Sequence, residues 1–169
     1  GIIDAIRVAA KKKGIKVNQV PFEKFRQLTQ SKIAQGVAAS KSEQKYYDLY
    51  EIIIESKKSQ YPLLLILDSI QDTHNVGAIL RSADCSGVDG IIITKNNSAP
   101  INETVVKTSA GASEHVKITL INNLAQTIDE LKQKGFWIIG SYLEGAKDYT
   151  SVDYKIPLAV IVGNEEKGI

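Results

Sequence analysis

The sequence has few of the residues that build metal sites and disulfide bonds. Among its 169 residues there is one cysteine, Cys85, and there are two histidines, His74 and His115. One cysteine cannot form an internal disulfide, and two histidines so far apart in sequence do not form the ligand cluster of a zinc or iron site. We therefore expect no disulfide framework and no bound metal.

Long apolar runs are also missing. No run approaches the roughly 20 residues that cross a bilayer, and no signal-peptide pattern opens the chain. We therefore expect a cytoplasmic protein without a membrane partner. With 43% hydrophobic and 24% charged residues, the composition is that of a globular protein with a buried core. The length suggests one domain, or a small domain joined to an incomplete second one.

The common nucleotide-binding and hydrolase motifs are absent. No G-x-G-x-x-G follows an expected strand, and there is neither a G-x-x-x-x-G-K-[ST] loop nor a G-x-S-x-G elbow. Residues 163–168 do not form a phosphate loop, because Lys167 precedes the second glycine and no Ser or Thr follows it. Cys85 lies inside an expected helix without a nearby histidine. Hydride transfer, nucleotide hydrolysis and acyl-enzyme chemistry are therefore disfavoured.

Positive charge is concentrated in the first part of the chain. Residues 1–60 contain 12 Lys or Arg against 6 Asp or Glu, whereas residues 61–169 contain 9 against 13. A basic module beside a mildly acidic body suits a protein that contacts nucleic-acid phosphates with one part and carries out its reaction with another. A solvated lysine-rich surface explains the same charges equally well.

The residues before position 62 alternate between helical and strand patterns. We expect a partial small α/β domain and its connecting helix over residues 1–56, followed by a polar linker at 57–61. Apolar residues at helical spacing predict the helices, and short apolar or small-residue runs predict the strands. The expected elements are helices at 1–13, 22–28 and 42–56 and strands at 15–20 and 35–39.

Residues 61–169 alternate buried strands with capped helices, a pattern typical of a parallel sheet with helices on both faces. We expect this α/β fold to form a second domain. The expected strands are 63–67, 90–94, 116–119, 136–141 and 157–162, and the expected helices begin at Asn75, near Glu103, and after Asn122 or Asn123.

The stretch from Leu63 to Ala83 joins the first of these strands to a polar loop and a helix. Asn75 stands where an N-cap belongs, and Arg81 follows it in the helix, near enough to reach back toward the loop. Ligands of parallel α/β proteins bind at the carboxyl ends of the strands. Two interpretations stay open: both residues belong to a site, or Asn75 only caps the helix and Arg81 is solvated.

Four polar or glycine-bearing loops follow the expected strands, and a ligand bound there would be held mainly by backbone groups. Gly111, Ala112 and Ser113 are expected outside the core, because they are small and polar. The four loops are 68–75, 111–113, 140–145 and 163–168.

Two segments resemble the signatures of a known family. Residues 67–93, LDSIQDTHNVGAILRSADCSGVDGIII, resemble the first signature of the SpoU (TrmH) family of RNA 2'-O-ribose methyltransferases, within the SPOUT superfamily. Residues 161–169, IVGNEEKGI, resemble the second signature. The strings QGVAAS, AGASEHVKI and WIIGSYL also match the layout of that family. The resemblance covers essentially the whole chain. It implies an α/β-knot fold, S-adenosyl-L-methionine as cofactor and RNA methylation as activity.

The resemblance also implies roles for individual residues. Asn75 corresponds to the asparagine that orders the active-site loops, and Arg81 to the arginine that lies against the target ribose. Glu165 corresponds to the glutamate that holds the arginine and the loops in place. A purely structural role competes with the functional one at each of these catalytic candidates. The residues placed in the cofactor pocket are Gly163, Gly140 and Ile161.

The implied chemistry needs few special side chains. A sulfonium methyl group is already electrophilic, so the enzyme mainly supplies proximity, in-line geometry and deprotonation of a poor nucleophile. Arginine stays protonated in proteins and is therefore a poor general base. We expect Arg81 to orient the ribose and to stabilise developing oxyanion charge, while substrate phosphate or water assists proton loss. No metal is required.

Two departures from the family pattern bear on what this chain contains. Family members continue into a third signature, which completes the cofactor site and threads the knot, whereas this sequence ends at Ile169. We therefore expect part of the cofactor pocket, the knot segment and part of a homodimer interface to be missing. The amino-terminal region resembles only the latter part of an L30e-like RNA-binding domain, and it has Ala34 where a histidine is common.

The leading hypothesis is a 2'-O-ribose methyltransferase that acts on structured RNA. The L30e-like domain favours ribosomal RNA, with a 23S guanosine-type target, over tRNA. The alternative is a non-catalytic RNA-binding member of the same fold, and the presence of Asn75, Arg81 and Glu165 argues against it. A generic nucleotide-binding domain is disfavoured by the missing phosphate loops.

Overall fold

The computed structural model describes residues 1–29, 36–39, 44–141, 145–164, 166 and 168–169. Contacts divide the chain into two units, residues 1–43 and residues 44–169. Helix α3 (Leu49–Ser56) packs with the sheet of the second unit. The division into an RNA-binding domain at 1–56 and a methyltransferase domain at 61–169 stays a prediction. None of the helices in these described ranges is long and apolar enough to cross a membrane.

The described residues of the first unit form the helices α1 (Ile2–Lys12) and α2 (Phe22–Thr29), as predicted. The strands predicted at 15–20 and 35–39 are wrong, because none of the described residues in either range is in a strand; Gln35 lies outside the described residues. A strand needs a hydrogen-bonded partner, and a short apolar run does not supply one by itself.

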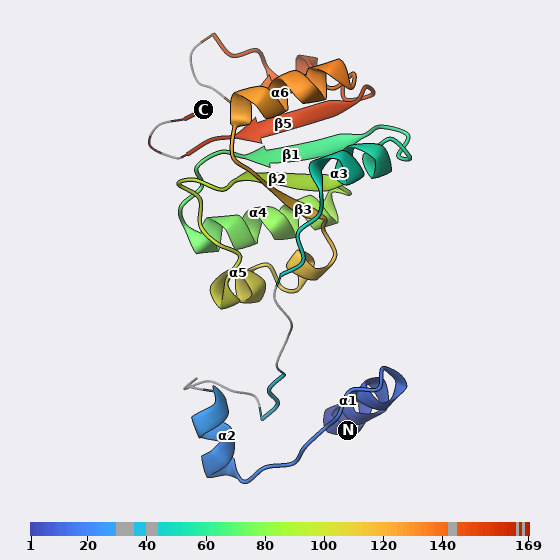
Figure 1. Ribbon diagram of the computed structural model, residues 1–169, viewed down its shortest axis with the longest axis vertical. Helices are drawn as coiled ribbons and strands as arrows, with labels where there is room; N and C mark the ends of the chain where they lie inside the picture. Colours follow the sequence, from blue (N-terminus) through green and yellow to red (C-terminus); the bar gives the residue numbers. More distant parts are fainter. Residues whose placement is uncertain (30–35, 40–43, 142–144, 165, 167) are drawn as a thin grey trace. The chain divides into compact units, whose positions relative to one another are not determined.

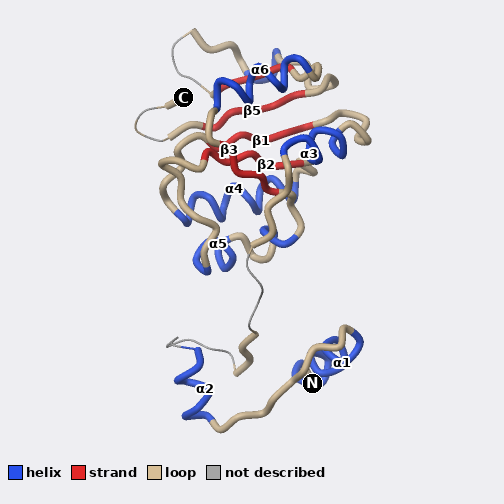
Figure 2. The backbone as a smooth tube through the Cα atoms, viewed as in Figure 1, coloured by secondary structure: helices blue, strands red, loops and turns tan. Residues whose placement is uncertain are grey.

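The second unit is built on a five-stranded sheet (Figures 1 and 2). Its strand order is β3-β2-β1-β5-β4, and every neighbouring pair is parallel. The predicted parallel sheet is therefore confirmed, although its third strand lies at 118–121 and not at 116–119. The strands are β1 (Leu63–Leu67), β2 (Gly90–Thr94), β3 (Ile118–Ile121), β4 (Trp137–Gly140) and β5 (Leu158–Val162).

Helices cover both faces of this sheet, as predicted. The helices besides α3 are α4 (Thr73–Cys85), α5 (Glu103–Thr108) and α6 (Leu124–Gln133). Successive residues of a strand point to opposite faces. In β2, Ile91 and Ile93 therefore join the core with α4 and α5, whereas Ile92 joins the core with α3 and α6.

Helix α3 is shorter than predicted. It begins at Leu49 and not near residue 42, because the Asp48 carboxylate caps it by accepting a hydrogen bond from Tyr50 N at 2.8 Å. Just before the cap, Tyr47 donates its backbone N–H to Ile118 O at 2.8 Å, which ties this segment to the start of β3. Residues 42–43 lie outside the described residues.

The segment after α5 is part of the core, which corrects the expectation for residues 111–113. Ala112 and Ser113 are only 4% and 1% exposed, and with Glu114 they form a short 3-10 helix that contacts α4. Small side chains suit this position because the turn packs closely under the helix. The same turn displaces the start of β3 along the chain.

Helix α4 begins at Thr73, and its N-cap is Asp72, so the predicted Asn75 cap is wrong. The Asp72 carboxylate accepts a hydrogen bond from His74 N at 2.7 Å, which satisfies one unpaired donor of the first turn. Asp72, Thr73 and Asn75 are all residue types that favour N-caps. Only Asp72 has the extended backbone of a cap, and Asn75 lies inside the first turn, half-buried.

Replacing Asp72 by alanine is expected to lower the free energy of unfolding by about 1 kcal/mol, the usual cost of a lost N-cap. Asp72→Asn keeps an acceptor oxygen and should cost much less. Urea unfolding of the two variants measures the difference. Equal stability of Asp72→Ala and the unchanged protein would contradict the cap.

Candidate functional site at the carboxyl ends of the strands

The carboxyl ends of β1 and β5 lie side by side where the strand order reverses. From β1 the chain runs outward through β2 to β3, then crosses to β4 at the other edge and returns through β5. Ligands of open parallel sheets bind in the crevice at such a switch point. Two hydrogen bonds of 2.9 Å join the chain after β1 to the end of β5 and to the residues that follow it, from Asp68 N to Val162 O and from Asn164 Nδ2 to Ser69 O.

The segment after β5 folds back on itself in a tight turn. Asn164 and Gly168 pair through two backbone hydrogen bonds of 3.0 and 2.9 Å, and the Asn164 side chain accepts from Glu166 N at 2.9 Å. A Cβ on Gly163 would overlap the carbonyl group of Gly168 and lie 2.8 Å from the backbone nitrogen of Ile169. Only glycine therefore fits at position 163, where one backbone segment closely approaches another.

The loop after β1 holds Ser69 in the left-handed region, at φ 58°. Its N–H donates to Thr94 Oγ1 at 3.0 Å, and its carbonyl accepts the Asn164 amide. Thr94 Oγ1 also lies 2.8 Å from Ser98 Oγ, so the loop after β2 is tied to the same point. A non-glycine residue keeps this strained conformation only where its neighbours hold it, which is common at functional sites.

The structure brings the three cofactor candidates together at this end of the sheet. Gly140 and Ile161 are direct neighbours in the β4–β5 register, and Gly163 follows β5. A Cβ on Gly140 would meet the side chain of Ile169. The Ile161 side chain is buried in the core with α3 and α6, so it shapes the strand and not the crevice.

The three catalytic candidates are placed differently from one another. Asn75 and Arg81 both lie on α4, but their separation along the helix puts them about 120° apart around its axis. Arg81 is exposed, whereas Asn75 shares the stripe of Ile79, which packs against the core. Glu165 lies outside the described residues, and its pairing with Arg81 stays a prediction.

Arg81 lines an open groove of about 730 Å³ between α4 and α5. His74 and Arg81 are seven residues apart, which places them on one stripe of α4, and this spacing could have been recognised in the sequence. Lys107, on α5, could not have been found that way, because its position opposite Arg81 depends on how the two helices pack. The residues that line the groove are His74, Ala78, Arg81, Thr104, Lys107, Thr108 and Ala110.

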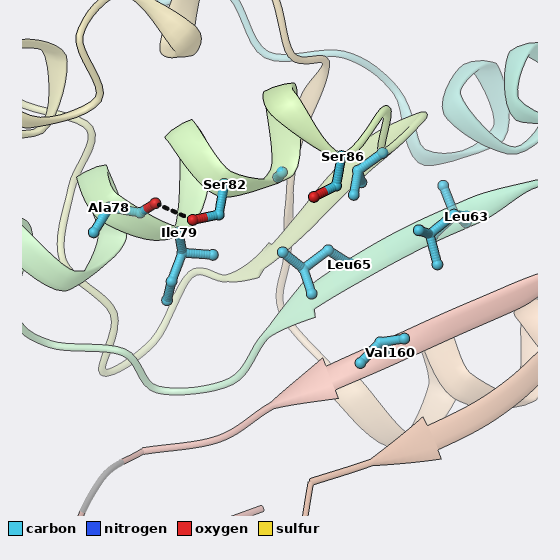
Figure 3. Close-up of a pocket in the computed structure, with 10 residues that line it drawn as sticks. Leu63, Leu65, Ala78, Ile79, Ser82, Ser86 and Val160 are labelled. Carbon is cyan, nitrogen blue, oxygen red and sulfur yellow. Dashed lines mark hydrogen bonds between the residues drawn. The ribbon is translucent and has the colours of Figure 1, made fainter. Parts of the chain in front are cut away.

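A second hollow, of about 380 Å³, lies between α4 and strands β1 and β5 (Figure 3). Figure 3 shows Leu65, Ile79 and Val160 facing it, with the Ser82 hydroxyl donating to Ala78 O at 3.1 Å. Its polar lining side chains are the hydroxyls of Ser82 and Ser86. Such apolar walls hold neither a sulfonium nor a phosphate, so this hollow is not the candidate site.

Among the described residues, the ionisable groups with displaced pKa values line neither of these two hollows. Burial raises the pKa of Tyr46, a hydrogen bond with Lys58 lowers the pKa of Glu55, and a hydrogen bond from Thr150 lowers the pKa of Asp148. Within the part of the chain that the structure describes, no group of three His, Cys, Asp or Glu could hold a metal ion. The site therefore offers backbone groups in the crevice and cations in the groove.

The described residues form an open parallel α/β sheet whose strand order reverses between β1 and β5, and folds of this class bind ligands at the carboxyl ends of the strands. The sequence model described as the SpoU rRNA Methylase family matches residues 62–169. The chain belongs to this family.

Two curated relatives match nearly all of the chain. YacO of Bacillus subtilis, named for the TrmH family of tRNA/rRNA methyltransferases, is 37% identical over 161 residues, which are 95% of this chain and 64% of that protein. A Staphylococcus saprophyticus protein named for the same family is 41% identical over 171 residues, which are 100% of this chain and 68% of that protein. The chain thus spans about two thirds of the length of these relatives.

Among solved structures, the AdoMet-bound rRNA methyltransferase from Sinorhizobium meliloti is similar with a TM-score of 0.79. The sequence identity is 24%, over 99% of this chain and 62% of that chain. The likeness shows a shared fold, and the predicted SPOUT-type α/β architecture is confirmed for the described sheet and helices. The knot stays a prediction.

Proposed function

We propose that the protein is an S-adenosyl-L-methionine-dependent methyltransferase that modifies a ribose 2'-hydroxyl in structured RNA, with ribosomal RNA favoured over tRNA. The observation that carries the proposal is the close backbone approach at Gly163, which admits no side chain, beside the adjoining carboxyl ends of β1 and β5 in a chain of the SpoU family. The RNA specificity rests on the resemblance to the L30e-like domain.

The crevice suits a cofactor that is held by main-chain groups. A side chain at Gly163 would displace the backbone of Gly168 and Ile169, so the backbone at Gly163 is kept bare and close to the strand ends. Gly140 and the backbone of Ile161 border the same crevice from β4 and β5. These three residues would hold the cofactor, which when bound supplies an electrophilic methyl group on its sulfonium.

Arg81 would contact the nucleotide that is modified. Its guanidinium is permanently protonated, so it cannot accept the proton of the 2'-hydroxyl. It can instead orient the ribose and stabilise the negative charge that develops on the oxygen as the proton passes to water or to a phosphate of the substrate. Asn75, half-buried in the first turn of α4, and Glu165 would keep the loops and the arginine in place.

The basic amino-terminal part would hold the RNA. Residues 1–60 contain twice as many basic as acidic side chains, 12 against 6. In α1 the basic residues Lys11 and Lys12 occupy the last turn and are exposed, where they are available to phosphates. We assign this part to an L30e-like RNA-binding module, and we expect the full-length protein to act as a homodimer, as the resemblance implies.

The test is methyl transfer from labelled S-adenosyl-L-methionine to unmodified transcripts of ribosomal RNA and tRNA, using the full-length protein. Label in a ribose of the ribosomal transcript is the expected result, with the position mapped by nucleoside analysis. Label in a base would overturn the 2'-hydroxyl as target, and label in tRNA alone would overturn the preference for ribosomal RNA. RNA binding without any transfer would favour the non-catalytic alternative.

A further inference from the structure

We propose that the groove between α4 and α5 binds a phosphodiester group of the RNA substrate and that Lys107 is the residue that positions it. The proposal rests on the proposed function, because it takes the ligand to be the RNA whose ribose Arg81 contacts. Lys107 lines the same groove as Arg81 and comes from the other helix.

The groove has a fixed floor because the two helices are in close contact. At Gly77 of α4, a Cβ would overlap the side-chain oxygen of Thr108 and lie 3.1 Å from the backbone nitrogen of Ser109. The Thr108 hydroxyl in turn donates to Thr104 O at 2.8 Å, within α5. Helices that approach without an intervening side chain cannot slide freely, so the cations on their rims keep a constant separation.

The side chains around this groove are cationic or neutral. Its ionisable lining groups are His74, Arg81 and Lys107, and no carboxylate lines it. Among the described residues, no ion pair within 4.0 Å involves Arg81 or Lys107, although Asp84 and Glu103 lie on the same helices. Cations that have no ion-pair partner among the described residues, gathered in a concave surface, attract an anion and release counterions when it binds.

A phosphodiester suits this groove better than the carboxylate of the cofactor. The cofactor candidates are Gly163, after β5, and Gly140, the last residue of β4, and neither of them lines the groove between α4 and α5. In RNA every internal ribose is flanked by two phosphates. A ribose held by Arg81 therefore brings a phosphate close to the neighbouring side chain of Lys107.

The experiment compares Lys107→Gln and Lys107→Arg with a control, Lys132→Gln, in the full-length protein. Lys132 is exposed on α6, on the opposite face of the sheet. Binding of an unmodified ribosomal RNA transcript is measured as a function of salt, together with binding of S-adenosyl-L-methionine alone. Loss of one phosphate contact should reduce the salt slope by about 1 and weaken RNA binding about eightfold at 0.1 M salt.

Several results would overturn the proposal. Weaker cofactor binding in Lys107→Gln would place the anion on the cofactor, and an unchanged salt slope would remove the phosphate contact. Equal effects of Lys107→Gln and Lys132→Gln on RNA binding would mean that Lys107 contributes only general surface charge and that the groove is not a phosphate site. Recovery of the salt slope in Lys107→Arg would support the proposal, because it would show that the RNA contact needs the positive charge and not the shape of the lysine side chain. The RNA-binding measurement tests the phosphate site independently of catalysis. Absence of methyl transfer would refute the proposed function but not the phosphate site.

Discussion

Replacing Arg81 by alanine is expected to lower kcat for methyl transfer by about a hundredfold to a thousandfold, the effect of removing one group that stabilises an oxyanion. Binding of S-adenosyl-L-methionine should not change, because Arg81 points into the α4–α5 groove and not into the crevice at β1 and β5. Single-turnover transfer at saturating RNA and cofactor measures the chemical step directly.

Two variants on the same helix serve as references for Arg81→Ala. Arg81→Lys keeps the charge but loses the planar fork of donors, so its rate should lie between those of alanine and arginine. Asp84→Ala changes an exposed side chain of α4 outside the groove and should transfer methyl groups at the normal rate. An unchanged kcat in Arg81→Ala would mean that Arg81 is a solvated residue.

The sheet could be predicted because its information is local. Each strand of the second unit lies in a short, mostly apolar run that is followed by polar or glycine residues, and such runs form buried parallel strands. The start of α4 could not be placed in the same way. Asp72, Thr73 and Asn75 are all residue types that favour an N-cap. Which of them caps the helix depends on where the pairing of β1 with β5 ends, and Asp68 N still donates a hydrogen bond to Val162 O of β5.

The site could be predicted only in its loops. The glycine and polar segments after the strands could be identified in the sequence. The hydrogen bonds that join these segments to one another could not be predicted. Ser69 is held by Thr94 and Asn164, residues that lie far from it along the chain. Lys107 reaches the groove of Arg81 only because Gly77 lets α5 approach α4. Contacts of this kind depend on tertiary packing and leave no periodic signal.

Replacing Gly163 by alanine is expected to weaken binding of S-adenosyl-L-methionine by at least about a hundredfold. The added Cβ would overlap the Gly168 carbonyl, and because the obstacle is backbone, the turn closed by the Asn164–Gly168 pair must move. That turn is tied to the loop after β1 through Asn164 and Ser69, so both walls of the crevice shift together. Overpacking of this kind costs about 1 to 3 kcal/mol of stability. Calorimetric titration with the cofactor measures the binding loss.

Gly90→Ala separates the loss of the crevice from a general loss of stability. A Cβ on Gly90 would overlap the Ile52 side chain, at the amino end of β2, so this variant is also overpacked, but against a side chain and at the opposite end of the sheet from Gly163. It should unfold at lower denaturant concentration and still bind the cofactor with normal affinity. If the two variants bind the cofactor equally well, Gly163 is needed for folding alone, and the crevice between β1 and β5 is not the cofactor site.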